Sequence, residues 1–399
     1  MASESRFSAA KDAAARNKRV ALVYFPHAGK TVYKFVDQIL CILIPISDFI
    51  TVVGGGTELL NEHDSARVRF ADIGITMHHN LANSPSLRLS KALWGVKAVL
   101  VQVLEAAALI KNARNIDVVL FYISYPSNAL PLMAAKILRK KTWMVMVTSG
   151  GDGRGPISYL QNLNKRLIYS LTDIITPESK RLVPELALGK YGAKVVGEGY
   201  RYVDTERYRI EKEFGQRTKV GFISRLEEKK GTLNFLRAVE IIQRHAYSDV
   251  SFLIGGDGPM RPVVEAEVAK LRSGGARIEY LGWIPETKFP YYLNELKVLV
   301  FPTTVEAKEG LPTIILEAMA CGTLALTTPV AAIPDVIHDG ATGFFLESSS
   351  PEHIAKGILR ALNYTGVNEV REQARALVEN KFSYAGAVER WEAILYGIQ

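Results

Sequence analysis

The chain has 399 residues, a length typical of two domains with sizeable cores, and 48% of the residues are hydrophobic while 23% are charged. This composition is ordinary for a globular protein and excludes a disordered or fibrous chain. The net charge of +8 favours phosphate-rich partners such as nucleotides or anionic lipids. The basic residues are spread along the chain without a nucleic-acid-binding signature, which argues against a nucleic-acid partner.

Targeting features point to the cytoplasm. Residues 1–18 form a polar, alanine-rich stretch without the apolar segment of a signal peptide, and we expect a flexible tail there. The apolar run 39–53 is interrupted by a proline and an aspartate and is too short to span a bilayer. Cys41 and Cys321 both lie in apolar runs, as reduced core cysteines do. We therefore expect a cytoplasmic protein, with the cytoplasmic face of a membrane as a further option.

The first half of the chain alternates short apolar runs with longer helical patterns. We predict strands at 20–25, 49–53, 68–76, 118–123, 143–147, 173–177 and 193–196, and helices at 36–44, 89–110 and 130–138. Such alternation predicts a parallel sheet flanked by helices. We assign residues 19–200 to this N-terminal domain and residues 201–217, which are polar and charged, to a linker.

The helix predicted at 89–110 has two readings. Its residues are apolar nearly all round, with Lys91, Lys97 and Glu105 as interruptions. The first reading is a core helix of the N-terminal domain, because a helix that is hydrophobic on every side is usually buried. The second reading is that part of it meets a membrane surface or a lipid acceptor.

Two glycine-containing loops in this half are candidates for contact with a ligand. Gly29 follows the first predicted strand, and a glycine there either lets the backbone approach a ligand or makes a plain turn. Residues 148–155 follow another strand and contain four glycines around Asp152. Glycines concentrated at the carboxyl end of a strand mark a place where the backbone comes close to another group.

The second half repeats the strand–helix alternation without repeating the sequence. Predicted strands lie at 219–223, 250–254, 278–281, 296–302, 323–326 and 344–346, and predicted helices begin at 232, 333, 351, 366 and 384. We assign residues 218–380 to a C-terminal domain and residues 381–399 to a helix that packs back on the N-terminal domain. The whole pattern predicts an α/β protein with two doubly wound, Rossmann-like domains that face a central crevice.

Two cations follow the first strand of the C-terminal domain. Arg225 leaves the end of the strand, and Lys230 lies just before the next helix. Both belong to the carboxyl edge of a parallel sheet, where two fixed cations can neutralise a diphosphate. The next strand ends in a turn that contains Gly256, which extends this edge.

The stretch 308–322 reads as a loop followed by a helix between two strands. Pro312 suits the first helical turn, and Gly322 suits the helix end. The backbone N–H groups of Gly310, Leu311 and Thr313 are then expected at the positive end of the helix, which is an anion site suited to a phosphate.

Two carboxylates bracket this predicted anion site. Glu309 lies just before the helix, and Glu317 can point back toward its beginning from the second turn. A partly buried carboxylate needs hydrogen-bond donors, which ligand hydroxyls can supply. The alternative is that Glu309 caps the helix by its charge and Glu317 accepts from a nearby backbone amide.

The run EGLPTIILEAMACG, with Glu-x7-Glu inside it, resembles the signature of the retaining GT-B glycosyltransferases of family four, the glycosyl transferases group 1. The resemblance is dense over residues 219–346. It implies that Glu309 contacts the hydroxyls of the donor sugar, that Glu317 holds the nucleotide ribose, and that the amides of Gly310 and Leu311 hold the diphosphate.

The resemblance extends to other positions of the chain. It implies that Arg225 and Lys230 bind the donor pyrophosphate and that Trp283 and Ile284, in the run 282–285, lie where the family seats the nucleotide base. Gly29 matches a loop that closes over the donor phosphates. Family members usually have a histidine in the loop that corresponds to 148–155, and this sequence has none; either Asp152, the polar group of comparable reach, takes that role or the site is altered.

We therefore interpret the chain as a transferase that moves a hexosyl or N-acetylhexosaminyl group from a UDP- or GDP-sugar to a glycan, a lipid-linked acceptor or a small molecule, with retention of configuration. No metal-binding cluster is visible, and we expect no requirement for a divalent metal. The alternatives are a non-catalytic partner subunit of the same fold and a nucleotide-sugar epimerase. A dehydrogenase ranks last, because no Gly-x-Gly-x-x-Gly follows the first strand.

Overall fold

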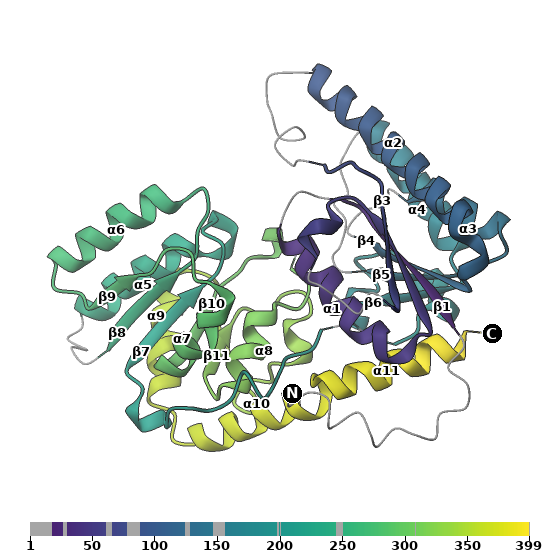
Figure 1. Cartoon of the computed structure of the whole chain (residues 1–399). Coiled ribbons are helices and arrows are strands. Elements are labelled where there is room, and N and C mark those ends of the chain that lie inside the picture. The colour runs from purple at the N-terminus through teal and green to yellow at the C-terminus, as the bar shows by residue number, and fades with distance from the viewer. Residues whose placement is uncertain are drawn as a thin grey trace. The chain divides into compact units, whose positions relative to one another are not determined.

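The computed structural model describes residues 18–26, 30–60, 66–77, 88–123, 128–146, 156–197, 199, 201–244, 250–307 and 309–398. The chain divides into two compact units (Figure 1), the first made of residues 1–177, 187–200 and 388–399 and the second of residues 178–186 and 201–387. The sequence placed 178–186 in the N-terminal domain. These residues belong to the second unit, where Ser179 Oγ and Arg181 Nε both bond to the Asp335 carboxylate.

The first unit is built on a six-stranded parallel sheet. The strands are β1 (Arg19–Tyr24), β2 (Phe49–Gly54), β3 (Val68–Asp72), β4 (Val118–Ile123), β5 (Lys141–Met146) and β6 (Ile174–Pro177), in the order β3-β2-β1-β4-β5-β6. Most side chains of the central strands are buried. Near-continuous apolar strands are typical of parallel sheets that are covered on both faces.

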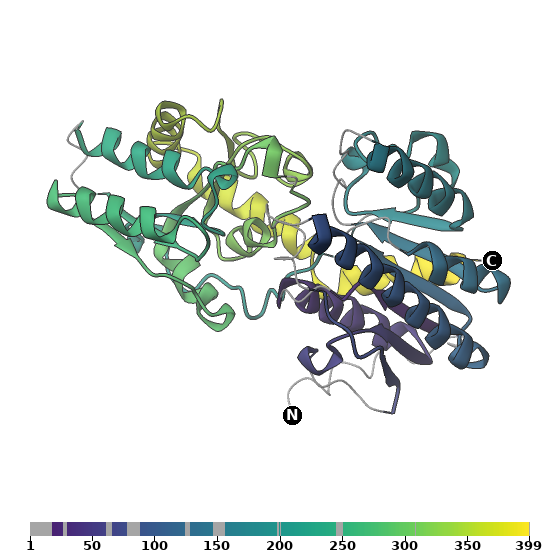
Figure 2. The same ribbon diagram turned by 90° about the horizontal axis from the view of Figure 1, so that it is seen from above.

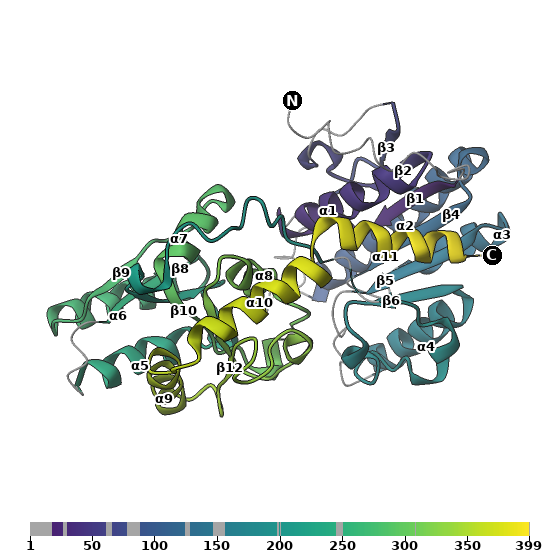
Figure 3. The same cartoon turned by 90° about the horizontal axis from the view of Figure 1, so that it is seen from below.

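Helices cover both faces of this sheet. α2 (Arg88–Asn112), α3 (Ala129–Ile137) and α4 (Pro156–Leu171) lie on one face, which is turned toward the viewer in Figure 2. α1 (Lys30–Ile46) and the end of α11 (Tyr384–Gly397) lie on the other face (Figure 3).

The C-terminal helix is held to the first unit by specific contacts. The Trp391 ring lies 4.7 Å from the Trp143 ring, centroid to centroid, and its Nε1 donates to the Gly199 carbonyl at 3.2 Å. Lys18 Nζ donates to the carbonyls of Leu395 at 2.9 Å and Ile398 at 2.7 Å. A cation suits these carbonyls because the last turn of a helix leaves them without partners.

One strand expected from the sequence is wrong. Residues 189–194 form a 3-10 helix instead of leading into a strand, and Val195 makes only an isolated bridge with Ile175. Gly197 then turns the chain with a φ of 73°, a conformation that glycine adopts without strain. The apolar residues of 193–196 therefore extend the sheet by a single bridge.

The second unit contains another six-stranded parallel sheet. Its strands are β7 (Lys219–Ile223), β8 (Ser251–Gly255), β9 (Ile278–Tyr280), β10 (Leu296–Phe301), β11 (Leu324–Thr327) and β12 (Phe344–Phe345), in the order β12-β11-β10-β7-β8-β9. The two sheets thus share one doubly wound topology, and the predicted fold class, GT-B, is confirmed by this topology and by the structural comparisons given below.

Two hydrophobic clusters correspond to the two faces of the second sheet. One joins the sheet to α5 (Thr232–Arg244), α6 (Arg261–Ser273) and α9 (Pro351–Leu362). The other joins it to α7 (Phe289–Glu295), α8 (Thr313–Ala320) and α10 (Val367–Lys381). Successive residues of β10 alternate between the clusters, as the period of a strand requires.

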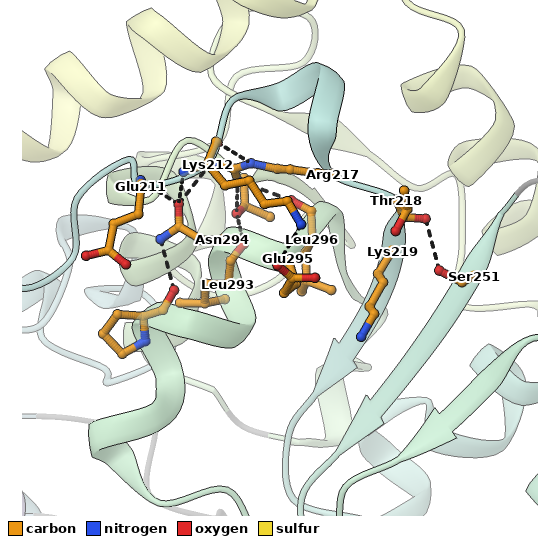
Figure 4. Close-up of polar contacts among 12 residues, drawn as sticks. Glu211, Lys212, Arg217, Thr218, Lys219, Ser251, Leu293, Asn294, Glu295 and Leu296 are labelled. Atoms are coloured by element: carbon orange, nitrogen blue, oxygen red, sulfur yellow. Dashed lines mark hydrogen bonds and ion pairs between the residues drawn. The ribbon is translucent and has the colours of Figure 1, made fainter.

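A buried arginine ties the segment before β7 to the sheet and to the end of α8. The Arg217 guanidinium is inaccessible to solvent. Figure 4 shows several of its contacts, which include Nε to the Lys212 carbonyl at 2.9 Å and Nη2 to Asn294 Oδ1 at 3.2 Å. Nη1 donates to Thr323 Oγ1 at 3.0 Å, and Nη2 also donates to the Cys321 carbonyl at 2.7 Å. Burial lowers the pKa of Arg217 to about 10.

Candidate functional site

A cavity of about 260 Å³ lies in the second unit at the carboxyl ends of β7, β8 and β10. In the strand order, β7 lies between β10 and β8, so the chain leaves β7 in one direction and returns on its other side. Ligands of open α/β sheets bind at such a switch point. The cavity is lined by Ile223, Ser224, Arg225, Lys230, Gly256, Asp257, Trp283, Ile284, Phe289, Phe301, Glu309, Pro312 and Ile314.

The loop after β7 buries a lysine in the cavity wall. Residues 228–230 form one turn of 3-10 helix, and Gly231 follows it with a φ of 77°. A Cβ atom at Gly231 would lie 2.5 Å from the carbonyl oxygen of Pro302, so only glycine permits this approach of the loop to the end of β10. The approach leaves Lys230 only 7% exposed.

Lys230 and Glu309 form an ion pair in the cavity, although 79 residues separate them. The Lys230 Nζ bonds to Glu309 Oε1, which also accepts from Thr303 Oγ1 at 3.3 Å. Burial and the nearby Arg225 guanidinium lower the pKa of the Lys230 ammonium to about 8. At this pKa the Lys230 ammonium stays mostly protonated at neutral pH, and a bound anion would further favour the charged form.

Arg225 places a second cation at the cavity, in a different environment. Its side chain is 67% exposed, and its Nη1 lies 3.1 Å from Glu227 Oε1. An exposed arginine can reorient toward a ligand at little energetic cost, since surface ion pairs contribute little to stability. The cavity therefore combines a fixed, buried cation with a mobile one, as expected for a site that binds a diphosphate.

The turn after β8 brings backbone into the cavity wall. Gly256 has a φ of 130°, and a Cβ atom there would lie 1.8 Å from the Ser224 carbonyl oxygen. No other residue fits this position, because the loops after β7 and β8 are in direct contact. Asp257 follows and accepts from the Gly258 N–H at 2.8 Å, which orients its carboxylate.

Trp283 and Ile284 line the cavity as the resemblance implied. Ile284 is buried, whereas Trp283 is 69% exposed. A large aromatic ring that remains exposed at the rim of a polar cavity offers a stacking surface for a planar ligand group.

The beginning of α8 differs from the anion site that the sequence predicted. Pro312 lies at the N-cap position with an extended conformation instead of in the first helical turn. The cavity is lined there by Pro312 and Ile314, while Gly310, Leu311 and Thr313 are outside its lining.

Two of these three residues already have partners within the second unit. The Leu311 amide stabilises the charged form of the buried Glu178 carboxyl, and Arg201 Nη1 donates to Thr313 Oγ1 at 3.2 Å. Arg201 also forms an ion pair with Glu178. Burial nevertheless raises the pKa of the Glu178 carboxyl. The sequence did not reveal this pair, because residues 178 and 201 lie more than a hundred positions before α8.

Glu317 is buried at 4% exposure and does not line the cavity. The Tyr208 phenol lies beside it, and burial together with the Glu317 charge raises the pKa of that phenol. The structure thus gives Glu317 a neighbour inside the protein, while its predicted contact with a nucleotide ribose stays a prediction.

Two predicted site residues, Gly29 and Asp152, lie outside the described residues. Within the described ranges, no group of three or more His, Cys, Asp or Glu side chains is placed to hold a metal ion.

Several lining residues were missed by the sequence reasoning. Ser224 and Asp257 directly follow predicted strands, so the rule that ligands bind at the carboxyl ends of parallel strands could have selected them. Phe289, Phe301 and Ile314 are apolar residues without a distinguishing signal, because only the packing of the loops places them at the cavity.

Comparison with known proteins gives consistent matches. Residues 217–364 match the family described as glycosyl transferases group 1. N-acetyl-alpha-D-glucosaminyl L-malate synthase of Bacillus anthracis is 24% identical over 304 residues, which are 72% of this chain and 77% of the relative. An uncharacterized glycosyltransferase of Methanocaldococcus jannaschii is 21% identical over 70% of this chain and 75% of its own length.

Solved structures match over nearly the whole chain. Anabaena Alr3699/HepE in complex with UDP and glucose superimposes with a TM-score of 0.67 at 15% identity and covers 94% of this chain and 99% of its own. A glycosyltransferase from Rickettsia africae gives a TM-score of 0.71 at 17% identity, with 96% and 98% covered. At this identity the similarity establishes the fold.

Proposed function

Because the chain belongs to the glycosyl transferases group 1 family and is a nucleotide-sugar-dependent glycosyltransferase, we propose that the cavity of its second unit binds a UDP-sugar and activates it for transfer. The observation that carries the proposal is the buried Lys230–Glu309 pair beside Arg225 at the switch point of the sheet. Two cations and a carboxylate at one cavity have the charges needed to bind a nucleotide diphosphate and its sugar.

The donor is assigned from the cavity together with a structural relative. A solved neighbour of the same fold holds UDP and glucose. In this chain, Trp283 supplies a surface on which a base can stack, and Gly256 belongs to the lining of the same cavity. The Glu317 carboxylate would then contact the ribose, a step that requires the Tyr208 phenol to share it or move aside.

The chemistry follows from the charge that develops as the sugar leaves. Breaking the bond between the anomeric carbon and the diphosphate places negative charge on the phosphate oxygens. The Lys230 ammonium and the Arg225 guanidinium stabilise that charge, and a donor that is stabilised more in the transition state than in the ground state reacts faster. Glu309 accepts from the sugar hydroxyls and orients the ring, after the donor phosphate has taken over Lys230.

We propose further that the product keeps the anomeric configuration of the donor and that the sugar is a hexosyl or N-acetylhexosaminyl group. The first unit supplies the acceptor site, and the acceptor is a glycan, a lipid-linked sugar or a small molecule. The roles that the family resemblance implies for Gly29 toward the donor phosphates and for Asp152 toward the sugar stay predictions. The two cations do the work of a metal ion, so the reaction proceeds without added divalent metal in the cytoplasm.

A donor screen tests the proposal. Thermal denaturation is measured with UDP-, GDP- and ADP-sugars, with magnesium and with EDTA, followed by slow hydrolysis of the donor. UDP-sugars should raise the melting temperature and be hydrolysed in EDTA. Stabilisation by a different nucleotide class would overturn the UDP assignment, and stabilisation without turnover in the presence of lipid and sugar acceptors would favour a non-catalytic subunit. The anomeric proton coupling of a transferred product, measured by NMR, decides retention.

A further inference from the structure

The α2 and α3 helices of the first unit form an exposed apolar surface. On α2, six large apolar side chains are exposed, namely Leu93, Val96, Val99, Leu100, Val103 and Ile110. On α3, which packs beside α2 (Figure 1), Leu130, Met133 and Ile137 are exposed as well. Exposed apolar residues scattered singly are normal, but a contiguous set marks an interaction site. We call these nine residues the apolar stripe.

The spacing of the stripe follows the helical period. The exposed residues of α2 at positions 93, 96, 100, 103 and 110 recur at intervals of three, four and seven, which places them on one face. The exposed residues of α3 at 130, 133 and 137 do the same. Val96 is 68% exposed and Ile137 is 78% exposed, so the stripe is fully open in this chain.

The opposite face of α2 is buried and contains a carboxylate, which an ordinary surface helix would turn toward solvent. Its buried residues are Ala98, Val101, Glu105 and Leu109. Glu105 is inaccessible to solvent, its two carboxylate oxygens have no hydrogen-bond partner among the described residues, and burial raises its pKa well above the usual value. A helix selected only to cover a sheet in water would turn its one carboxylate outward and its leucines and valines inward. The reversal indicates that the outer face meets something apolar.

Most charges near the stripe are positive, although Asp117 and Asp173 lie close by and pair with Arg19 and Lys136. Residues 88–115 and 128–141 contain nine Lys or Arg residues, and Glu105 is their single acidic residue. The segments that follow both helices converge at one edge of the sheet, where the Lys141 N–H donates to the Asp117 carbonyl at 3.3 Å. The exposed cations Lys111 and Arg114 therefore lie at the same edge as Arg139. An apolar stripe that ends in cations complements an anionic bilayer surface.

The sequence allowed either a core helix or a membrane-facing helix at 89–110, and the reading as a fully buried core helix is wrong. Leu93–Asn115 is long and apolar enough to cross a membrane by length and composition, yet only 22% of its 18-residue apolar window is buried. Its buried face packs against α3 and β2 of its own unit, so the helix presents one face outward instead of being surrounded by lipid.

We propose that the apolar stripe docks the first unit on an anionic lipid bilayer, with α2 and α3 lying in the plane of the interface. The stripe enters the boundary between headgroups and acyl chains, and the cations at 111, 114 and 139 contact lipid phosphates. A second copy of this chain and an apolar protein partner are the competing occupants. The bilayer is favoured because every exposed charge within α2 and α3 is positive, whereas two copies of the same face would repel each other.

Vesicle flotation tests the docking with the full chain. Vesicles of phosphatidylcholine with about 30% phosphatidylglycerol are compared with pure phosphatidylcholine at about 100 mM salt. The protein should float with the anionic vesicles, and Leu100→Glu combined with Val103→Glu should lower the partition coefficient at least about 10-fold. Lys111→Glu combined with Arg114→Glu should lower it about 25-fold or more, since each cation near such a surface contributes about 5-fold.

Matched controls separate docking from general surface effects. Val263→Glu places a charge on an exposed valine of α6, and Arg244→Glu combined with Lys270→Glu makes the same change of net charge in the second unit. These controls should float like the unchanged chain, and all variants should keep donor hydrolysis and melting temperature. Failure of the unchanged chain to float, equal loss in the controls, or a dimer in light scattering that Leu100→Glu abolishes would each overturn the proposal.

Discussion

The ion pair between Lys230 and Glu309 allows function and stability to be separated in one experiment. A pKa lowered from 10.5 to about 8 corresponds to about 3 kcal/mol at 1.36 kcal/mol per pKa unit, which is the approximate cost of holding the Lys230 charge in the cavity wall. The protein tolerates this cost in the absence of a ligand, which is expected of a group that serves binding rather than folding.

The perturbation is Lys230→Met combined with Glu309→Gln, which removes both charges while keeping the shapes. Replacing a buried pair by neutral groups is often neutral or stabilising by about 1–4 kcal/mol. We therefore expect a melting temperature equal to or above that of the unchanged chain. Donor turnover should fall at least about 100-fold, the size of losing one charge-stabilising contact in the transition state, about 2.7 kcal/mol or more.

The assay pairs thermal denaturation with donor turnover at saturating UDP-sugar. Lys230→Met alone should be less stable than the double variant, because it leaves the Glu309 carboxylate with Thr303 as its remaining donor in the described contacts. Lys229→Met is the matched control, since that lysine is 45% exposed and pairs with Glu227, and its turnover should change less than about 3-fold. Turnover of the double variant within 10-fold of the unchanged chain would refute the assignment of these residues to the site.

Three further predictions concern pH, base stacking and folding. The value of kcat/KM for the donor should fall as the pH rises above about 8, because the free enzyme then loses the Lys230 proton; a profile that stays flat to pH 10 would contradict this role. Trp283→Ala should raise the KM for the donor about 10-fold with little change in kcat, measured beside Tyr291→Ala, another exposed aromatic residue, outside the cavity lining. Arg217→Met should lower the free energy of unfolding in urea by about 3 kcal/mol or more, since it removes the guanidinium that donates to buried carbonyls such as that of Cys321; Arg209→Met, at an exposed position, is the control and should change it by less than about 0.5 kcal/mol.

Local pattern was sufficient for most of the architecture. Short apolar runs such as 219–223 and 296–302 read as buried parallel strands, and the helices between them follow from period and turn residues. The strand predicted at 193–196 failed for a physical reason, because the residues are apolar enough for a strand but the preceding glycine-containing segment coils into a 3-10 helix. The residue pattern predicts that a segment can form a strand. The conformation of the backbone before it decides whether that strand joins the sheet.

The candidate site was partly predictable. Arg225, Lys230 and Gly256 were selected because residues after parallel strands meet at one edge, and Glu309 because it precedes a helix within the Glu-x7-Glu motif; all four line the cavity. The amide of Leu311 was assigned to a ligand because the beginning of a helix is an anion site in isolation. In the folded chain, the Glu178 carboxyl takes that position, a contact over more than a hundred residues that no local rule contains.

What the sequence by itself determined is which residues share a strand, a helix face or a loop, because backbone geometry repeats at fixed periods of 2.0 and 3.6 residues. It also predicted the family that residues 217–364 match, since the motif carries its own chemistry. Only the tertiary structure decided what each face meets. It paired Lys230 with Glu309, surrounded Arg217 with carbonyls, and turned Glu105 inward while leaving the apolar stripe of α2 in the open. The helical period shows which residues share a face of a helix. It does not show what that face contacts, because those contacts depend on the packing of segments that are distant in the chain.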